Sequence, residues 1–514
     1  MRAQLLTSLH RFKLMIVCSR SKGDRRLIIA LCIIYLLALT IRLGLIFNEN
    51  TNPWGLIYSV PIGEAARNLV EGRGYVIDQE YVDKLSTLVL ATNRWQDPED
   101  IPPPDREPFV PYYGQAPGSS ALLAATYLVF GEYRFIYGRV IQCIIDAFGC
   151  IIMFLVAREL FNTRTGLIAA SIYAVFLPIA YLATLVVQDA IMPFLVLTSF
   201  YFFVKGVKTN KFVFYIVSAL FVAVSCYFQP STVYLPLFYG LGMLIYKVHR
   251  HELFKQILYA IKITAAMFIV LVIMIAPWAI RNYYITGTLT LNLKVVSWAG
   301  VWEGFGEFDD NPAGAVFSDV YVMDLARNEL GENVIYGSPE FEAHFRNKVM
   351  RVVQEQPLWL VSAWARRLPF TLIYGNHIGL ESKCPDGLSV DECRQLNTNY
   401  VDYISALKQG RLIEFIAAHP GSAFYWGMVF AFATIPLLLS LIGAWIQRRN
   451  WRTLILLAVV PVYLAVVCIT VTTMGTGKST LPGSIAYIML SAVVIDYICS
   501  RIKCLHRGTD DFTK

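Results

Sequence analysis

The ionisable side chains best placed for chemistry stand where apolar stretches of the chain end or in the long polar loops between them. Glu64 and Asp189 are two carboxylates of this kind, and Arg42 and Arg281 are matching cations. A carboxylate can accept a proton, whereas the guanidinium fork of arginine pairs with two phosphate oxygens. Ionisable residues at such edges are therefore candidates for a functional site. The simpler alternatives are acids that only face water and arginines that reach toward lipid headgroups.

The composition of the chain indicates a membrane protein. Its 514 residues are 56% hydrophobic and 16% charged, with a mean hydropathy of +0.51. A soluble domain would carry about 25% charged residues. The net charge of +7 does not indicate nucleic-acid binding, because the basic residues stand in short runs between apolar stretches, as they do beside membrane spans.

The apolar stretches predict an all-α polytopic membrane protein with about ten transmembrane helices. About 20 apolar residues cross a bilayer as a helix, because backbone groups find no water there. Two long polar segments, 48–136 and 281–421, are predicted as outer-face loops with interfacial helices at Ser119–Phe130 and Pro357–Leu372. The predicted spans are 27–47, 137–157, 166–186, 190–206, 212–228, 231–248, 257–280, 422–446, 453–474 and 483–500.

The basic connectors orient these spans. Cytoplasmic loops carry an excess of Lys and Arg, and the connectors rich in these residues all fall on one side. Because ten is an even number, both termini are predicted to be cytoplasmic. The chain is divided into a transmembrane module at 1–290, an outer-face region at 291–421, and C-terminal helices with a tail at 422–514.

Two of the ten cysteines suggest a covalent link. Cys384 and Cys393 are close in sequence in the second outer loop, and Pro385–Gly387 between them can turn the chain. A disulfide is expected if that face is oxidising, and two free thiols are the alternative.

A series of short motifs accompanies the charged candidates. The first outer loop carries an acid followed by Ala-x-Asn-Leu-x-x-Gly-x-Gly-Tyr, and further matched positions follow in order along the chain. The order of these motifs, and the side of the membrane on which they lie, give the sequence a resemblance to a known family. It resembles C-type-fold membrane glycosyltransferases of the family 39-like group, which includes protein O-mannosyltransferases and the aminoarabinose transferase of lipid A. The matched residues are Ala66, Asn68, Leu69, Gly72, Gly74, Tyr75, Pro117, Gly118, Phe130, Gly131, Asp189, Pro277, Trp278, Arg281, Asn282 and Tyr283, with Lys478 and Pro482 beyond.

The resemblance covers residues 27–290 well and the remainder in outline, and it implies a reaction. Such enzymes move one sugar from a polyprenyl-phosphate carrier to a lipid, glycan or protein acceptor on the outer face. The resemblance implies Glu64 and Asp189 as catalytic carboxylates, one of them the general base. No cofactor is predicted with certainty and no metal ligands are assigned, although a divalent metal is compatible with the reaction. The residues expected to bind substrate are Arg42, Arg67, Gln115, Arg281 and Lys478.

The sequence departs from the family pattern at two positions. The main catalytic Asp of the family stands eight residues before the motif alanine, where this chain has Tyr58. A tyrosine cannot replace a carboxylate base at neutral pH, and the nearest acid is Glu64. Ala116 replaces the lysine of the aminoarabinose transferase, which disfavours that substrate.

Three other functions are compatible with parts of the pattern. A secondary transporter would explain the spans and the intramembrane Asp146, but repeated halves are not evident. A surface-polysaccharide polymerase or ligase also uses lipid-linked sugars, and a non-catalytic relative that binds such lipids would explain Tyr58. The order of the motifs favours the glycosyltransferase, and the resemblance implies a bacterial inner membrane as its location.

Reporter fusions test the predicted topology. Fusions within 48–136 and 281–421 should report the outer face, and fusions within the linker 247–256 should report the cytoplasm, because that linker is rich in basic residues. An outer-face signal from the linker would overturn the ten-span arrangement.

Overall fold

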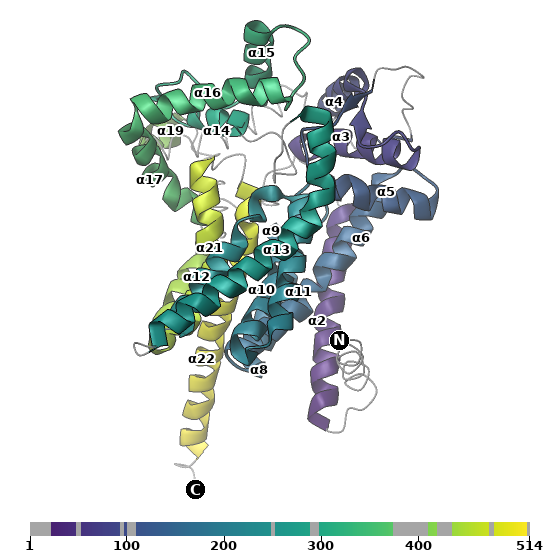
Figure 1. Ribbon diagram of the computed structural model, residues 1–514. Helices are drawn as coiled ribbons and strands as arrows, with labels where there is room; N and C mark the ends of the chain where they lie inside the picture. The colour runs from purple at the N-terminus through teal and green to yellow at the C-terminus, as the bar shows by residue number, and fades with distance from the viewer. Residues whose placement is uncertain are drawn as a thin grey trace.

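The computed structural model describes residues 22–47, 53–92, 97–99, 109–247, 252–287, 298–373, 410–418, 434–471 and 477–510. Helices make up nearly all of the regular structure in these ranges, and the one sheet pairs two short antiparallel strands. Figure 1 shows a lower layer of long helices, with two groups of helices above it at left and right. The all-α polytopic fold predicted from the sequence is confirmed.

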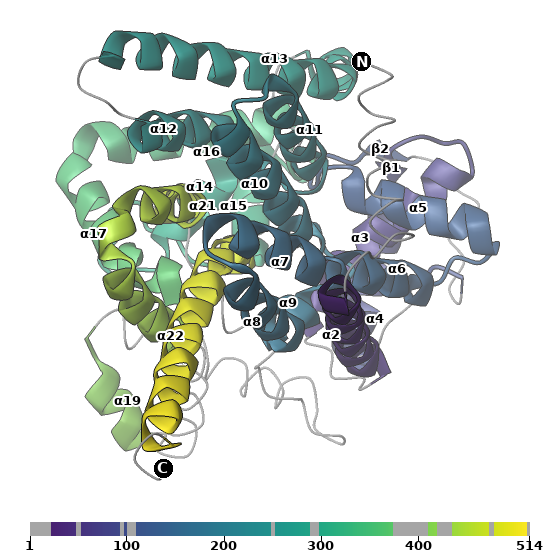
Figure 2. The same ribbon diagram turned by 90° about the horizontal axis from the view of Figure 1, so that it is seen from below.

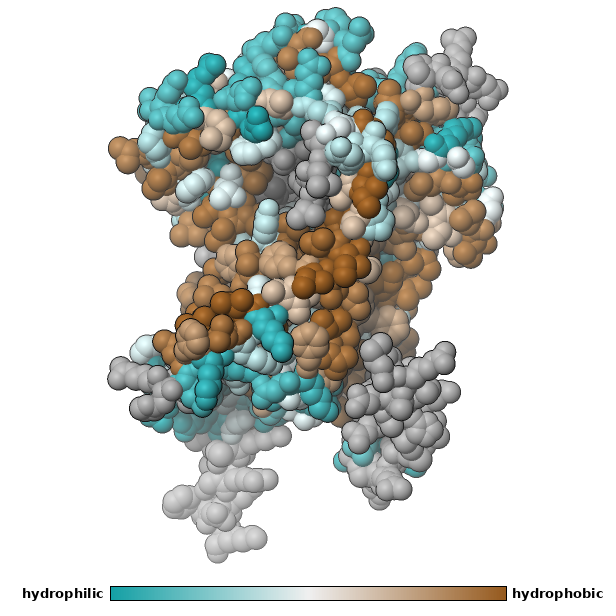
Figure 3. Space-filling model, viewed as in Figure 1, coloured by the Kyte–Doolittle hydropathy of each residue, from teal (hydrophilic) through white to brown (hydrophobic). Residues whose placement is uncertain are grey.

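The lower layer holds the helices that are long and apolar enough to cross a membrane. Among the described residues there are five such segments: Asp24–Phe47, Phe135–Leu160, Leu253–Thr286, Arg448–Thr470 and Ser479–Ile502. Shorter apolar helices lie at Phe212–Phe228 and Thr434–Ile446. Figure 3 shows the resulting brown apolar band between hydrophilic ends. The total of ten spans stays a prediction.

Each predicted span with described residues contains a helix, but several of these helices are shorter than the span. The span predicted at 166–186 is divided, because α8 ends at Val175 and α9 starts at Leu177 with Pro178 in its first turn. Proline has no N–H and disfavours a helical residue before it. The helices of this layer are α2 (Lys22–Phe47), α6 (Phe135–Ala147), α7 (Gly149–Leu160), α8 (Thr163–Val175), α9 (Leu177–Leu182), α10 (Met192–Thr209), α11 (Phe212–Phe228), η1 (Pro230–Thr232), α12 (Leu235–Lys247), α13 (Leu253–Thr286), η4 (Arg448–Asn450), α21 (Trp451–Thr470), η5 (Gly477–Gly483) and α22 (Ser484–Asp510).

The outer layer comes from the two long polar segments. The first segment supplies the group at right in Figure 1, and the second supplies the group at left. The second has its own apolar core, in which Trp302, Phe341 and Phe345 are buried. The elements are α3 (Pro53–Val70), β1 (Val76–Ile77), α4 (Gln79–Thr92), β2 (Val110–Pro111) and α5 (Gly118–Phe130), then α14 (Trp298–Phe305), α15 (Asp319–Leu330), α16 (Pro339–Glu355), α17 (Pro357–Ile373) and α19 (Leu412–Ala418).

A buried ion pair joins the second outer segment to the membrane layer. Arg367 of α17 donates from Nε to Glu307 at 3.0 Å, and both side chains are fully buried. The same guanidinium donates from Nη1 to the carbonyl of Ile469 in α21 at 2.9 Å. This arginine therefore fixes α17 against the outer end of a membrane helix.

A second buried ion pair lies in the membrane layer itself. Arg42 of α2 donates from Nε to Asp146 of α6 at 2.7 Å, and both side chains have no exposed surface. The hydroxyl of Tyr173 in α8 donates to the other carboxylate oxygen at 2.8 Å. Gly149 leaves room for this tyrosine, because a Cβ there would lie 2.4 Å from its hydroxyl oxygen. Asp146 of α6 therefore bonds to two neighbouring helices, α2 and α8.

Asp146→Asn should destabilise the fold, because it leaves the Arg42 guanidinium buried without its counter-charge. Removing one partner of a buried pair costs about 3–5 kcal/mol, whereas removing both charges costs far less. Unfolding of detergent-solubilised protein in increasing denaturant measures the loss, and Asp309→Asn on the exposed outer surface is the control. The double variant Arg42→Leu, Asp146→Leu should recover much of the stability. Equal stability of parent and Asp146→Asn would contradict the role of the pair.

Candidate functional site

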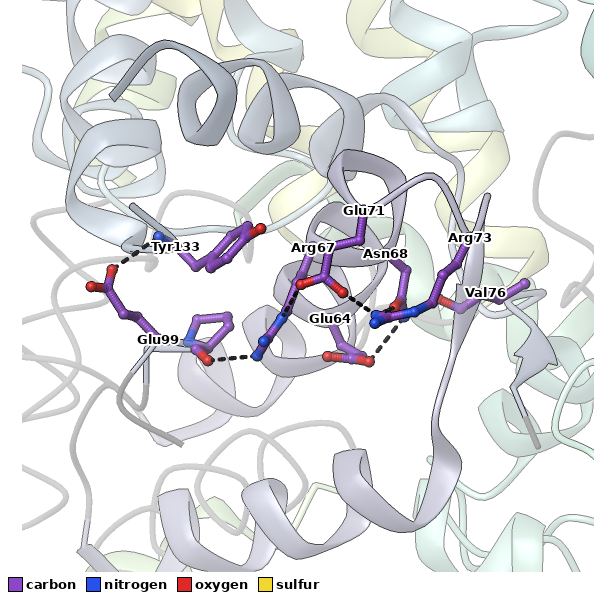
Figure 4. A network of polar contacts seen from close by, with 9 residues as sticks. Glu64, Arg67, Asn68, Glu71, Arg73, Val76, Glu99 and Tyr133 are labelled. Carbon is purple, nitrogen blue, oxygen red and sulfur yellow. Dashed lines mark hydrogen bonds and ion pairs between the residues drawn. The ribbon is translucent and has the colours of Figure 1, made fainter. Parts of the chain in front are cut away.

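The first motif forms the end of α3 and the turn into β1. Gly72 and Gly74 have φ angles of +79° and +89°, a region that L side chains rarely adopt. Asn68 donates to Glu64 at 2.9 Å and to the carbonyl of Val76 at 2.9 Å. The asparagine thereby ties the helix to the strand that follows the glycine turn (Figure 4).

Glu64 lies one helical turn before Asn68 in α3 and is fully buried. Its Oε1 accepts the hydrogen bond from Asn68, and its Oε2 has no hydrogen-bond partner in the described part of the chain. Burial raises the pKa of the Glu64 carboxyl above its usual value, although the Asn68 hydrogen bond and the nearby Arg67 lower it. A carboxyl with a raised pKa suits acid–base chemistry near neutral pH.

Arg67 is turned toward another acid one helical turn away. Its Nε donates to Glu71 at 2.8 Å, and its Nη1 donates to the carbonyl of Pro98 at 3.1 Å. Glu71 also forms an ion pair with Arg73, which donates to Asn68 at 2.9 Å. Figure 4 shows this network around Glu64, which holds the end of α3 in one arrangement.

Tyr75 brings the separate motifs together. Its hydroxyl donates to the carbonyl of Gln115 at 3.1 Å, and its ring centroid lies 5.1 Å from that of Trp278. Arg281 donates from Nη2 to the carbonyl of Tyr75 at 2.9 Å and lies over the Trp278 ring at 4.9 Å. Residues near positions 75, 115 and 280 therefore meet at one place, although the sequence separates them by up to 206 positions.

The turn before α5 connects this junction to the membrane helices. A Cβ on Gly118 would lie 2.6 Å from the carbonyl oxygen of Tyr227 in α11, so only glycine fits this approach. The next residue, Ser119, donates from its hydroxyl to the carbonyl of Val187 at 3.3 Å. The turn is thereby packed against the segment that leads into Asp189.

Asp189 is fully buried at the connection between α9 and α10. Its Oδ1 accepts from Ser479 at 2.7 Å and from the side-chain amide of Gln229 at 3.0 Å. Gln229 follows α11 and Ser479 lies in η5, so three helix ends meet at this carboxylate. Sequence analysis missed the roles of Gln229 and Ser479, and their position in polar turns between spans was the available signal.

Glu64 and Asp189 come from neighbouring elements of the structure. Ile62 and Ala66 of α3 share one buried apolar cluster with Val186, three residues before Asp189. Helix α3 and the segment that carries the second carboxylate therefore contribute to the same apolar cluster.

The remaining predicted site residues lie in several different places. Gln115 is buried at the Tyr75 junction, and its Oε1 has no hydrogen-bond partner in the described ranges. Arg42 lies apart from the Tyr75 junction. Its guanidinium forms an ion pair with Asp146 and donates to the carbonyls of Ala38 and Ala174. Lys478 lies in η5, but its side chain is outside the described residues, as are Cys384 and Cys393.

Tyr58 occupies the position of the family's usual acid, and its surroundings differ from those of Glu64. Tyr58 of α3 is 37% exposed, whereas Glu64 on the same helix is buried. No group of three or more His, Cys, Asp or Glu side chains within the described ranges could hold a metal ion. Glu64, Asp189 and Arg281 are the charged candidates for this site whose surroundings the structure describes.

One family model matches part of this region. Residues 114–280 match the model described as dolichyl-phosphate-mannose-protein mannosyltransferase. The match confirms the resemblance to C-type-fold membrane glycosyltransferases. Asp189 lies inside the matched segment, Arg281 follows it directly, and Glu64 lies before it. The search of curated proteins gives no match.

Solved structures similar to this chain include two of an archaeal oligosaccharyltransferase from Archaeoglobus fulgidus. The complex with zinc and sulfate is 11% identical, with a TM-score of 0.45, and the match covers 92% of this chain and 49% of that one. The complex with an inhibitory peptide and a dolichol-phosphate is 12% identical, with a TM-score of 0.49, and the match covers 96% and 52%. This chain spans about half the length of those chains.

Glu64→Gln tests the burial of the carboxyl through pH. Because the folded-state pKa is raised, the folded protein binds more protons than the unfolded chain, and its free energy of unfolding falls as pH rises above about 4.3 through the raised value. The variant cannot titrate there and lacks this decline. Thermal unfolding of both proteins in one detergent from pH ~4 to ~8 measures the difference. Parallel pH profiles would contradict the raised pKa.

Proposed function

We propose that this protein is a membrane glycosyltransferase that moves a sugar from a polyprenyl-phosphate carrier to an acceptor on the outer face. The observation that carries the proposal is the junction at Tyr75, where the first-loop motif, the turn before α5 and Arg281 meet. The family match over 114–280 supports the same reaction class. The acceptor is a lipid, a glycan or a protein.

Arg281 is the proposed contact for the donor phosphate. Its side chain donates to the carbonyl of Tyr75 and to the amide oxygen of Asn282, which are both neutral. These contacts orient the guanidinium without neutralising it. The positive charge therefore remains for the phosphate oxygens, which arginine binds in a bidentate manner. The rings of Tyr75 and Trp278 beside it exclude water and strengthen the attraction.

Glu64 and Asp189 have different proposed roles. Asp189 is held by Gln229 and Ser479, and it orients the reacting groups. Glu64 takes the proton from the acceptor hydroxyl as that oxygen attacks the anomeric carbon. The bond from the anomeric carbon to the phosphate oxygen breaks, and the electron pair leaves with the polyprenyl phosphate. Arg281 stabilises the charge that develops on that phosphate, and the single displacement inverts the anomeric centre.

A non-catalytic relative that binds a lipid-linked sugar is the second candidate. It is favoured by Tyr58 at the position of the usual acid. Both candidates require donor binding at Arg281, and only the enzyme requires turnover.

The proposed location is a bacterial inner membrane, with both termini in the cytoplasm. The basic connectors between the helices support this orientation. It places α3, α5 and α14 to α17 outside, where lipid-linked sugars are consumed. Comparison of lipid and glycan extracts with and without the gene by mass spectrometry identifies the acceptor.

Arg281→Ala should weaken binding of a polyprenyl-phosphate donor. Hydrogen bonds to charged groups contribute about 1.5–3 kcal/mol, so the dissociation constant should rise by about 10-fold to 150-fold. Arg281→Lys keeps the charge and should lose less. Lys262→Ala, on an exposed face of the same helix, is the matched control. If Arg281→Ala binds the donor as tightly as the parent does, Arg281 does not contact the donor phosphate and only holds the helix end at the membrane surface.

Asp189→Asn and Glu64→Gln should each reduce turnover. Loss of the general base in Glu64→Gln should cost about 10²–10⁴-fold in rate. Asp189→Asn removes the charge that orients the reacting groups, and each variant keeps the size of its side chain. Turnover of a radiolabelled donor measures the rate, with Glu80→Gln on the exposed side of α4 as the control. Near-normal turnover of Glu64→Gln would place the base elsewhere. A parent that binds donor and transfers no sugar would favour the non-catalytic relative.

A further inference from the structure

A cavity of about 380 Å³ lies at the other end of the membrane layer from the catalytic candidates. It is formed where α10 ends, α12 ends and α13 begins, on the face that the basic connectors mark as cytoplasmic. Figure 1 places the start of α13 beside α12 at lower left, and Figure 3 shows the apolar band giving way to hydrophilic residues in that region. Its volume is in the range of small-molecule sites.

The lining of this cavity is apolar at its base and basic at its edge. Met243 and Ala260 are buried residues among the apolar lining. Lys247 and Lys255 supply two positive charges from two different helices. A cavity with this division of chemistry suits a ligand with an anionic group and an apolar portion.

The two lysines are held differently. Lys247 ends α12, donates to the side-chain oxygen of Asn210 and lies over the Tyr259 ring at 4.8 Å. Asn210 and Tyr259 are both neutral groups, so these two contacts position the ammonium group without pairing it with an acid. Lys255 is 81% exposed and lies 3.7 Å from the exposed Glu252, a contact that contributes little in water. One cation is thus positioned in advance, and the other can close over a ligand.

The surface next to the cavity indicates which kind of anion binds. Phe254 and Leu258 of α13 are 73% and 51% exposed, and they continue the apolar face of a helix long enough to cross the bilayer. Acyl chains would cover these side chains, whereas a free phosphate would leave them and the apolar base without a partner. Basic pockets between transmembrane helices on the cytoplasmic side bind anionic lipid headgroups.

We infer that the cavity between α10, α12 and α13 binds the headgroup of an anionic phospholipid. Lys247 and Lys255 contact the phosphate, and the exposed apolar residues at the start of α13 contact the acyl chains. The site is separate from the junction at Tyr75, and it does not depend on the proposed reaction.

Native mass spectrometry of the full-length protein in neutral detergent tests the inference. The probes are phosphatidylglycerol, phosphatidylcholine and inorganic phosphate, each added alone. The parent should retain phosphatidylglycerol in preference to phosphatidylcholine. Lys247→Gln with Lys255→Gln should reduce this retention by about tenfold or more, because each cation near the membrane surface strengthens binding of anionic lipid.

Three variants keep the result interpretable. Arg448→Gln with Arg449→Gln removes two positive charges elsewhere on the same predicted face and should retain the lipid as the parent does. Lys247→Arg with Lys255→Arg keeps both charges and should also retain it. Lys255→Gln alone changes an exposed side chain, cannot unfold the helix, and should still weaken retention.

The outcomes separate the lipid from a free anion and from no site at all. Selective loss of phosphatidylglycerol in the Lys247, Lys255 variants supports the inference. Phosphatidylglycerol retained equally by the parent and the double glutamine variant would overturn it. Inorganic phosphate that displaces phosphatidylglycerol completely at equal concentration would overturn the lipid assignment and leave a soluble anion as the ligand.

Discussion

Polar groups in the membrane layer must find their partners inside the protein, because the bilayer interior has no water. Arg42 meets this requirement through Asp146 and two carbonyl groups, and the Tyr173 hydroxyl donates to the other oxygen of the Asp146 carboxylate. Arg367 of the outer helix α17 is also fully buried, and it is paired with Glu307 and with the carbonyl of Ile469 in α21. These contacts join α2, α6 and α8 in one place and α17 and α21 in another. The outer segments therefore rest on a frame whose helices are held at defined positions.

The candidate site is built on the outer ends of that frame. Asp189 receives hydrogen bonds from residues that follow α11 and precede α22, so any shift of those helices would change its surroundings. The first outer loop is attached through Tyr75 and the turn at Gly118, which contact α13 and α11. A site assembled from helix ends is rigid where the chemistry requires alignment.

Most residues of the first-loop motif hold the backbone of the loop in place and have no proposed contact with substrate. Asn68 links α3 to β1, the two glycines make the turn, and Tyr75 attaches the loop to the membrane helices. Glu64 is the member whose arrangement costs stability, since its carboxyl is buried and one of its oxygens has no hydrogen-bond partner among the described residues. A group that is kept at such a cost is a better candidate for chemistry than for structure.

The sequence by itself determined the fold class, the places of the apolar helices with described residues, and Glu64, Asp189 and Arg281 as candidates, because hydrophobic length and charge are local properties. Only the tertiary structure decided that Arg42 is the partner of Asp146, and that Gln229 and Ser479 hold Asp189. These pairs are 104, 40 and 290 positions apart. Contacts over such separations depend on how whole helices pack, and no local pattern encodes that packing.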